Sequence, residues 1–286
     1  MRIPKVLAIH DISCAGRASL TVILPVLAAC GIEAIPLPTA VLSNHLAFSH
    51  VSSLDFTPYM QSFMDAWDRN GISFDGIYSG YLASPEQVYV VKEAIKRYGV
   101  RIPVMIDPAM ADHGRFYSGQ NTEMVEHMRH LIRRAHVIKP NYTEACFLAG
   151  VSCDKNVIPD EGRIDYLLDY LGQSTERVII TSIPRGHDTY CNISLDKRTG
   201  EKEIVSFPYI PFTTYGTGDI FSSIVMAGTL KNIPLAQTMR IATAFLQKAI
   251  EATAKAGTSP LEGILFEENM LPELTETMER AVAGNE

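Results

Sequence analysis

A short glycine-rich run that ends in a carboxylate is the strongest chemical signal in this sequence. Gly216-Thr217-Gly218-Asp219 stands directly before an apolar helical pattern that starts at Ile220. The first turn of a helix has backbone N–H groups without partners in the helix, and the helix dipole favours negative charge there. Glycines also let the backbone come close to a bound group. The run therefore predicts an anion cradle, in which Asp219 would take a proton from a hydroxyl that attacks a phosphoryl group.

A structural interpretation of the same run stays open. Asp219 would then do no more than complement the helix dipole at the end of a Gly-rich turn. These four residues alone do not decide between the two interpretations. The decision depends on the polar residues elsewhere in the chain.

Two further carboxylates follow the strand-like run 104–106. Asp107 and Asp112 are five residues apart in one loop. Such side chains suit Mg²⁺, which usually takes one or two protein carboxylates together with substrate phosphates. A turn with an Asx cap explains the same residues equally well.

The segment from Lys139 to Glu144 also has two interpretations. Asn141 with Glu144 three residues later has the pattern of a capping box at a helix start. Because the segment follows a predicted strand at 137–139, the two side chains could instead reach a hydrated metal ion.

Other polar residues give weaker signals. Ser43-Asn44-His45 follows the strand-like run 39–42 and offers three hydrogen-bonding side chains, although a satisfied loop histidine is slightly favoured for His45. His127 and His130 lie on a predicted exposed helix face without a third ligand at useful spacing. Cys14 has no identifiable activating base.

Composition excludes several classes of function. The chain has 286 residues, of which 47% are hydrophobic and 20% charged, and its net charge of −7 argues against a nucleic-acid surface. The longest apolar stretch, 20–30, contains a proline and is about half of what a membrane span needs. The apolar run 6–9 is too short for a signal-peptide core. Five cysteines without a CxxC pair predict reduced thiols and a cytoplasmic location.

Strand and helix patterns alternate along the whole chain, without a visible linker or repeat. A helix is expected from Ser84-Pro85 to Tyr98 because Ser caps and Pro at the first position favour helix starts. The strands are expected at 6–9, 39–42, 76–79, 104–106, 137–139 and 178–181, and the remaining helices at 17–29, 55–70, 122–135, 141 onward, 219–230 and 235–256. The segments 189–195 and 203–207 predict an antiparallel hairpin.

This alternation predicts an α/β fold with a mainly parallel central sheet flanked by helices, in a single domain over residues 1–286. Ligands of such folds bind at the carboxyl ends of the strands, where most of the polar clusters above lie. No Walker A, GxGxxG or HExxH motif occurs, so P-loop, dinucleotide and zincin interpretations are weak.

Taken together and in this order, the motifs resemble the pyridoxal kinase branch of the ribokinase-like superfamily, from the first strand to about residue 256. The GTGD run marks the superfamily, whereas SNH and the Gly-Tyr after the strand at 76–79 point to the vitamin B6 branch. The residues that carry the resemblance are Ser43-Asn44-His45, Ser79-Gly80-Tyr81, Asp107-Pro108, Asp112, Pro140-Asn141, Glu144, Thr181-Ser182 and Gly216-Thr217-Gly218-Asp219.

The resemblance implies a three-layer α/β/α fold and a role for each matched residue. Asp219 would be the catalytic base on the 5′-hydroxymethyl group, and Gly216, Thr217 and Gly218 would form the cradle. Asp107 and Glu144 match positions tied to the metal ion. Positions near ATP are matched by Asp112, Asn141, Thr181 and Ser182, and positions at the substrate by Ser43, His45 and Tyr81.

The chain departs from the family pattern after its first strand. Familiar pyridoxal kinases have a Ser there that contacts the pyridine nitrogen, whereas this chain has Asp11, and segment 13–17 lacks their GxxGN form. Leu46 follows the SNH triplet where a Thr is common. A carboxylate favours a protonated ring, so we expect Asp11 to face the ring nitrogen and to alter the preferred vitamer, with pyridoxamine as one option.

The resulting expectation is a kinase that uses ATP and Mg²⁺ to phosphorylate pyridoxal, pyridoxamine or pyridoxine. A monovalent cation such as K⁺ and the oligomeric state stay open, although the family implies a homodimer. The expected partners are small molecules, with neither nucleic acid nor membrane. The alternatives are a hydroxymethylpyrimidine kinase, which differs in the ring pocket, and a non-catalytic vitamin B6 or nucleotide sensor.

Overall fold

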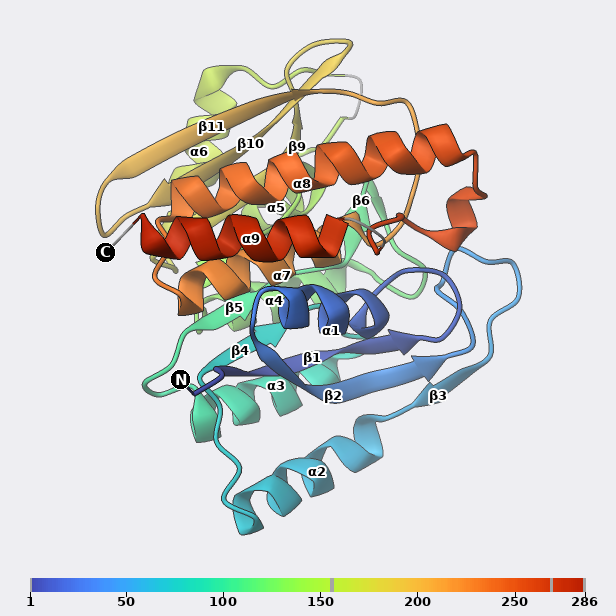
Figure 1. The fold of residues 1–286 in the computed structure, drawn as a ribbon, viewed down its shortest axis with the longest axis vertical. Helices are drawn as coiled ribbons and strands as arrows, with labels where there is room; N and C mark the ends of the chain where they lie inside the picture. Colours follow the sequence, from blue (N-terminus) through green and yellow to red (C-terminus); the bar gives the residue numbers. More distant parts are fainter. Residues whose placement is uncertain (1, 155–156, 268–269, 285–286) are drawn as a thin grey trace. The chain divides into compact units, whose positions relative to one another are not determined.

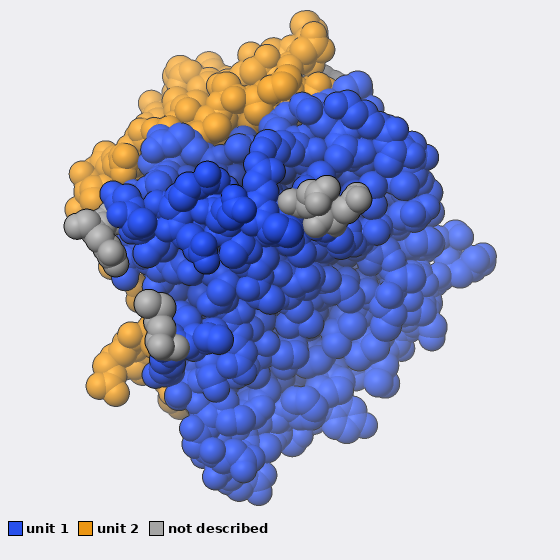
Figure 2. Space-filling model, viewed as in Figure 1, with its two compact units in different colours: residues 1–78, 210–286 blue, residues 79–209 orange. Residues whose placement is uncertain are grey.

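The structure is a computed structural model that describes residues 2–154, 157–267 and 270–284 of the chain. Its internal contacts divide the chain into two compact units, coloured separately in Figure 2. Unit 1 comprises residues 1–78 and 210–286, and unit 2 comprises residues 79–209. The range 1–286 of the predicted single domain includes residues outside the described ones, and the domain assignment stays a prediction.

The strands of unit 1 follow the order β4-β1-β2-β3 (Figure 1). Strands β1 (Lys5–Ser13) and β2 (Glu33–Leu42) are parallel, with an irregularity between His10 and Ile12. Strand β3 (Ser53–Asp55) pairs antiparallel with the end of β2, and β4 (Gly76–Ser79) ends at the boundary of the unit. The loop between β1 and α1 thus begins at the end of a buried strand that is parallel to its neighbour β2.

The helices of unit 1 bury apolar faces against these strands and against one another. Helix α1 (Leu20–Ala29) contacts β1, β2, α7 and α9, whereas α2 (Thr57–Arg69) contacts β2. The remaining helices are α7 (Thr217–Leu230), α8 (Leu235–Ala256), the 3₁₀ turn η1 (Pro260–Glu262) and α9 (Met270–Ala283). Fully buried aliphatic side chains from β1 and α1, such as Leu7, Ile9 and Ile23, form the core between them.

The strands of unit 2 follow the order β11-β10-β9-β8-β5. Strands β5 (Val104–Ile106), β8 (Val137–Ile138) and β9 (Arg177–Pro184) are parallel. Strands β10 (Thr189–Asp196) and β11 (Glu201–Pro208) add an antiparallel hairpin. A second, smaller hairpin consists of β6 (Ala111–Asp112) and β7 (Arg115–Phe116).

Helices α3 to α6 belong to unit 2. Neighbouring helices contact one another in the order α3, α4, α5 and α6, and α5 and α6 also contact β9. Their bounds are α3 Pro85–Tyr98, α4 Thr122–Ile132, α5 Tyr142–Ala149 and α6 Glu161–Gly172. The predicted α/β class, with mainly parallel strands, flanking helices and a small antiparallel hairpin, is confirmed.

Some predicted bounds are wrong for identifiable reasons. Helix α1 begins at Leu20 instead of 17, because Ser19 has a left-handed backbone (φ 62) that interrupts the helix. Strand β2 runs through Pro36 and Pro38, which sequence patterns treat as breakers. Strand β3 pairs only with residues 40–42, so Pro36 and Pro38 lie where β2 has β1 as its one partner among the described strands, and prolines are tolerated at such an edge. Helices α6 and α9 were not predicted.

The predicted Ser cap of α3 is wrong. Ser84 makes no side-chain hydrogen bond to the first turn of the helix; instead Gln87 Oε1 accepts a hydrogen bond from the Ala83 N–H.

Among the described residues, no helix has the length and apolar character to cross a membrane. The five cysteines are free thiols, of which Cys14 is exposed. The cytoplasmic location stays a prediction.

Candidate functional site

The Gly-rich run forms the start of α7, as predicted. Gly216 caps the helix with a left-handed backbone (φ 87), and its position admits only glycine because an added Cβ would lie 2.5 Å from the Arg17 carbonyl oxygen. Thr217 and Gly218 begin the helix and Asp219 is its third residue. Gly216 has no side chain to cap the first turn, so an anion can approach the helix N-terminus.

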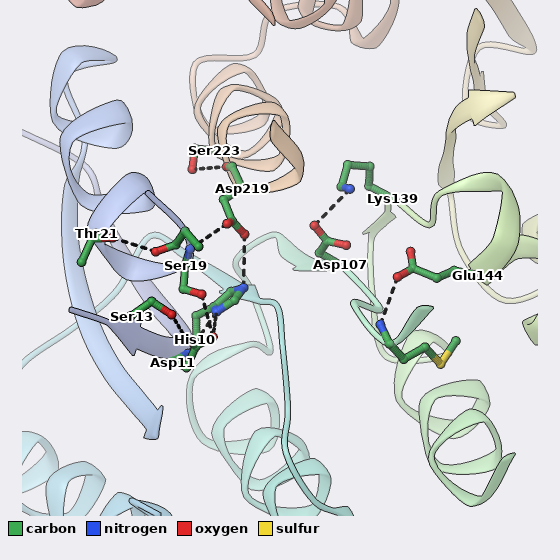
Figure 3. A network of polar contacts seen from close by, with 12 residues as sticks. His10, Asp11, Ser13, Ser19, Thr21, Asp107, Lys139, Glu144, Asp219 and Ser223 are labelled. Carbon is green, nitrogen blue, oxygen red and sulfur yellow. Dashed lines mark hydrogen bonds and ion pairs between the residues drawn. The ribbon is translucent and has the colours of Figure 1, made fainter. Parts of the chain in front are cut away.

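Asp219 is held from two sides and still reaches the surface. Its Oδ2 accepts a hydrogen bond from the Ser19 backbone N–H at 2.7 Å, and its Oδ1 lies 3.3 Å from His10 Nε2 (Figure 3). The Asp219 side chain is 16% exposed. A carboxylate that is fixed in orientation and partly accessible fits a general base.

Asp11 lies behind His10 at the end of β1 and is 3% exposed. Its Oδ1 lies 2.8 Å from His10 Nδ1 and accepts a hydrogen bond from Ser19 Oγ at 2.7 Å, and its Oδ2 accepts one from Ser13 Oγ at 2.9 Å. Burial acts to raise the pKa of Asp11, but the hydrogen bonds and charge of His10 and the two Ser hydrogen bonds hold it below its usual range. Three donors of unit 1 thus already bind the Asp11 carboxylate. We call His10, Asp11, Ser13, Ser19 and Asp219 the Asp219 cluster.

The side chains of Ser43 and His45 form hydrogen bonds with neighbouring parts of the protein. Ser43 Oγ donates to Asn44 Oδ1 and accepts from the Ser52 N–H. His45 is 5% exposed; its Nε2 lies 2.9 Å from the Leu261 carbonyl oxygen, and its ring centroid lies 4.4 Å from that of Tyr215. These contacts agree with a satisfied loop histidine, and the substrate roles of Ser43 and His45 stay predictions.

In unit 2, Asp107 follows β5 and forms a buried ion pair. Its Oδ2 lies 3.1 Å from Lys139 Nζ at the end of β8, and each residue is 4% exposed (Figure 3). Sequence reasoning did not give Lys139 a role, although a charged residue directly after a buried strand is the signal that selected Asp107.

Asn141 and Glu144 form the capping box at the start of α5. Asn141 Oδ1 accepts from the Glu144 N–H, and Glu144 Oε2 accepts from the Asn141 N–H, both at 2.9 Å. Glu144 Oε1 accepts from the Met110 and Ala111 N–H groups, and Asn141 Nδ2 donates to the Ala111 carbonyl oxygen. Burial, and secondly the charge of Asp107, raises the pKa of Glu144 to about 8. We call Asp107, Lys139, Asn141 and Glu144 the Glu144 cluster.

The Glu144 cluster fits only a metal ion that brings most of its own ligands. No group of three or more His, Cys, Asp or Glu side chains that could hold a metal occurs among the described residues. Asp107 and Glu144 supply the hard oxygen atoms that Mg²⁺ prefers, but both already bind donors of the protein. Mg²⁺ commonly keeps its waters and substrate phosphates and takes one or two carboxylates, and the donor set agrees with that mode.

A small hollow in unit 2 contains two of the residues predicted to lie near ATP. Asp112 and Ser182 line it together with Thr143, Cys153 and Tyr190, and with His113, Tyr142 and Pro184. Ser182 has a left-handed backbone (φ 59), and its N–H donates to Asn192 Oδ1. Such conformations in non-glycine residues are sparse and cluster at functional sites.

Thr181 and Tyr81 do not line this hollow, and neither do the predicted residues of the Glu144 cluster. Thr181 is buried, and its N–H donates to the Pro140 carbonyl oxygen. Tyr81, predicted to line the ring pocket, follows β4 and is half-buried. Their ligand contacts stay predictions.

Sequence reasoning missed His10 and Ser19, which hold Asp219. His10 directly precedes Asp11 after an apolar strand, so its place at a strand end was a usable signal. Ser19 acts through its backbone N–H and its unusual φ, and no residue pattern reveals such a conformation.

The comparisons with known proteins identify the family. A family model described as phosphomethylpyrimidine kinase matches residues 24–262. The chain belongs to this family. Hydroxymethylpyrimidine/phosphomethylpyrimidine kinase of Staphylococcus aureus is 25% identical over 89% of this chain and 91% of its own length.

Solved structures extend the similarity to the whole fold. A candidate phosphomethylpyrimidine kinase from Bacteroides thetaiotaomicron aligns with a TM-score of 0.91 at 36% identity, over 96% of this chain and 94% of that one. A second crystal form with pyridoxal aligns with a TM-score of 0.89 at 33% identity, over 97% and 96%. Pyridoxal kinase from Lactobacillus plantarum gives 0.85 at 26% identity, over 99% and 98%. The predicted ribokinase-like fold and the resemblance to pyridoxal kinases are confirmed.

Proposed function

We propose that this family member transfers a phosphoryl group from ATP to the 5′-hydroxymethyl group of a vitamin B6 compound: pyridoxal, pyridoxamine or pyridoxine. The observation that carries the proposal is Asp219, a fixed and partly exposed carboxylate in the first turn of a helix whose N-cap, Gly216, has no side chain. That turn offers backbone N–H groups to a transferring phosphoryl group, and the carboxylate accepts the proton of the attacking hydroxyl.

The proposed roles of the other matched residues come from the family resemblance and are given for each unit by itself. In unit 1, Gly216, Thr217 and Gly218 offer N–H groups and Asp219 orients the acceptor hydroxyl. In unit 2, Asp112, Asn141, Thr181 and Ser182 are proposed for the nucleotide, and Asp107 and Glu144 for Mg²⁺. When bound, Mg²⁺ would neutralise charge on the phosphates, and positioning supplies most of the rate acceleration in such transfers.

A vitamin B6 substrate is supported by the similarity to a structure that holds pyridoxal and to a pyridoxal kinase. A hydroxymethylpyrimidine kinase is the second candidate, because the Staphylococcus aureus relative is described as a hydroxymethylpyrimidine/phosphomethylpyrimidine kinase and the family model as a phosphomethylpyrimidine kinase. Both substrates present a hydroxymethyl group on a nitrogen heterocycle, so Asp219 would serve either. Ser43, His45 and Tyr81 are the residues proposed to distinguish the rings. A cytoplasmic homodimer is also proposed.

A coupled assay of ADP release tests the proposal. Pyridoxal, pyridoxamine, pyridoxine, hydroxymethylpyrimidine and ribose are compared at equal concentration with ATP and Mg²⁺, with and without K⁺. We expect turnover with at least one vitamin B6 compound to exceed that with the pyrimidine. A higher rate with hydroxymethylpyrimidine selects the second candidate. Binding of pyridoxal without turnover of any compound would overturn the kinase assignment in favour of a sensor.

A further inference from the structure

His10 lies between two carboxylates inside unit 1. Its Nδ1 is 2.8 Å from Asp11 Oδ1 and its Nε2 is 3.3 Å from Asp219 Oδ1, and the residue is 4% exposed (Figure 3). A neutral imidazole has one N–H donor, whereas the imidazolium ion has two. The doubly protonated ring is therefore the state in which both nitrogens donate to the carboxylates that face them.

One competing arrangement exists for Nδ1. The backbone N–H of Asp11 lies 3.0 Å from the same nitrogen, and a ring protonated only at Nε2 would accept it. That state would leave a nitrogen lone pair 2.8 Å from the Asp11 carboxylate, which is repulsive. A hydrogen bond to an ionised carboxylate is about twice as strong as a neutral one, so the imidazolium is favoured.

The charges around the ring favour the same state. Burial acts to lower the pKa of His10, but the hydrogen bonds and charges of Asp11 and Asp219 outweigh burial and raise it to about 10. Asp11 from β1 and Asp219 from α7 are the charged groups that act on the ring. Ser13 and Ser19 in turn bind Asp11, so the chain of contacts continues to the backbone of the loop before α1.

Ser19 connects the two carboxylates independently of the histidine. Its N–H donates to Asp219 Oδ2 at 2.7 Å and its hydroxyl donates to Asp11 Oδ1 at 2.7 Å. Ser19 is the residue directly before α1, and its backbone has a positive φ of 62°. Strained backbone at a contact with a reactive group is a recurrent feature of functional sites.

We propose that His10 is an imidazolium that positions the carboxylate of Asp219, and that Asp11 orients His10 instead of contacting the substrate ring. His10 holds Oδ1 and the Ser19 N–H holds Oδ2, so the plane of the carboxylate is fixed while further lone pairs stay available for a hydroxyl. The inference rests on the proposed function in one respect, namely that Asp219 is the base. In phosphoryl transfer the placement of the hydroxyl matters more than the strength of the base, so a nearby cation is tolerable.

The first test measures the charge of His10 without any turnover. ¹⁵N NMR of the histidine rings is recorded from pH 6 to pH 9, and the His10 signal is identified by its absence from His10→Gln. We expect both ring nitrogens of His10 to stay protonated across most of this range, and Asp219→Asn to bring deprotonation to lower pH. A His10 ring that is neutral at pH 7 would overturn the inference.

The second test measures catalysis. We expect His10→Ala to lower kcat by about 10²-fold with the KM values for ATP and the acceptor changed by less than about threefold, as a misplaced catalytic group does. His10→Gln, which keeps one N–H donor, should recover part of the loss, and Asp11→Asn should give a smaller loss of the same kind. His130→Gln on the exposed face of α4 is the matched control. An unchanged kcat in His10→Ala, or equal loss in affinity and kcat, would contradict positioning.

The two tests separate this inference from the proposed function. If the wild-type protein phosphorylates none of the acceptors, the kinase assignment fails whatever the NMR result. If the wild type is active but His10 is neutral, the kinase assignment stands and the role of His10 fails.

Discussion

Asp219 and Glu144 are both the third residue of a helix, yet their surroundings differ in almost every respect. Asn141 caps α5 with its side chain, and Glu144 turns back to the Asn141 N–H and is 2% exposed. Gly216 caps α7 without a side chain, and Asp219 turns to Ser19 and His10 and stays 16% exposed. The residue before the helix thus decides whether its first turn is closed by the protein or open to a ligand.

The length of the acidic side chain contributes to the same difference. Glutamate is one methylene longer than aspartate and reaches the N–H of its own cap residue, which completes a capping box. The shorter Asp219 binds donors from another part of unit 1. We infer that the Glu144 carboxylate serves mainly the fold of unit 2 and that Asp219 serves chemistry. The following predictions test this contrast.

The largest effect is expected for Asp219→Asn. The amide keeps the size of the side chain but cannot take a proton, so kcat should fall by about 10²–10⁴-fold. Isothermal titration calorimetry should show near-normal affinity for the acceptor, because the hydroxyl can still be held. The control is Glu33→Gln, which removes an exposed carboxylate of unit 1 paired with Lys5. A near-normal kcat in Asp219→Asn would refute its assignment as the base.

Asp107→Asn should be the most destabilising change in the Glu144 cluster. It leaves the buried ammonium of Lys139 without the carboxylate 3.1 Å away. Removing one partner of a buried ion pair typically costs about 3–5 kcal/mol of the free energy of unfolding. Urea denaturation measures the loss, and the double variant Asp107→Asn with Lys139→Met should recover part of it. If the single variant is as stable as wild type, the pair has no structural role.

Glu144→Gln should destabilise the protein by about 1–3 kcal/mol, because both carboxyl oxygens of Glu144 face backbone N–H groups and the amide nitrogen of Gln accepts no hydrogen bond. The loss should depend on pH. An acid whose pKa is raised on folding binds more protons in the folded state, so its stabilising contribution is lost as pH rises from the ordinary carboxyl range to about 8. The difference in Tm between wild type and Glu144→Gln should therefore narrow between pH 5 and pH 8.

The same variant tests the proposed metal contact. If Glu144 faces Mg²⁺ as proposed, the Mg²⁺ concentration for half-maximal rate should rise in Glu144→Gln at a temperature where the variant is folded. An unchanged concentration together with lower thermal stability would show that Glu144 only closes the helix.

Asp112→Ala should have the smallest effect on stability, within about 0.5 kcal/mol, as for most surface positions. The Asp112 side chain is 44% exposed, and its Oδ1 accepts a hydrogen bond from the N–H of its own neighbour, His113. If Asp112 lies near ATP, the KM for ATP should still rise by a few-fold while the KM for the acceptor stays constant. Equal changes in both KM values would argue against a nucleotide contact.

The sequence predicted well what local patterns determine. The starts and ends of α3, β4, β5 and α8 follow from apolar spacing and, for the start of α3, from Pro85. The place of Asp219 in the first turn of α7 follows from the glycines before it. The capping box of Asn141 and Glu144 was one of two open interpretations, and it is the one that the structure contains.

Contacts between distant segments could not be predicted in this way. Ser19 and Asp219 are 200 residues apart, and their contact depends on the packing of α1 against α7. The ion pair of Asp107 with Lys139 depends on the parallel pairing of β5 with β8. The left-handed backbones of Ser19 and Ser182 have no signature in residue type, since neither is glycine.

The most direct test is the rate of phosphoryl transfer in a single turnover, measured for wild type, Asp219→Asn and Glu144→Gln. Each protein is mixed at pH 7 with limiting ATP, saturating Mg²⁺ and the preferred acceptor, and rates are corrected to the folded fraction. We predict that Asp219→Asn loses about 10²–10⁴-fold while Glu144→Gln stays within about tenfold of wild type. A larger loss in Glu144→Gln than in Asp219→Asn would contradict the assignment of chemistry to Asp219.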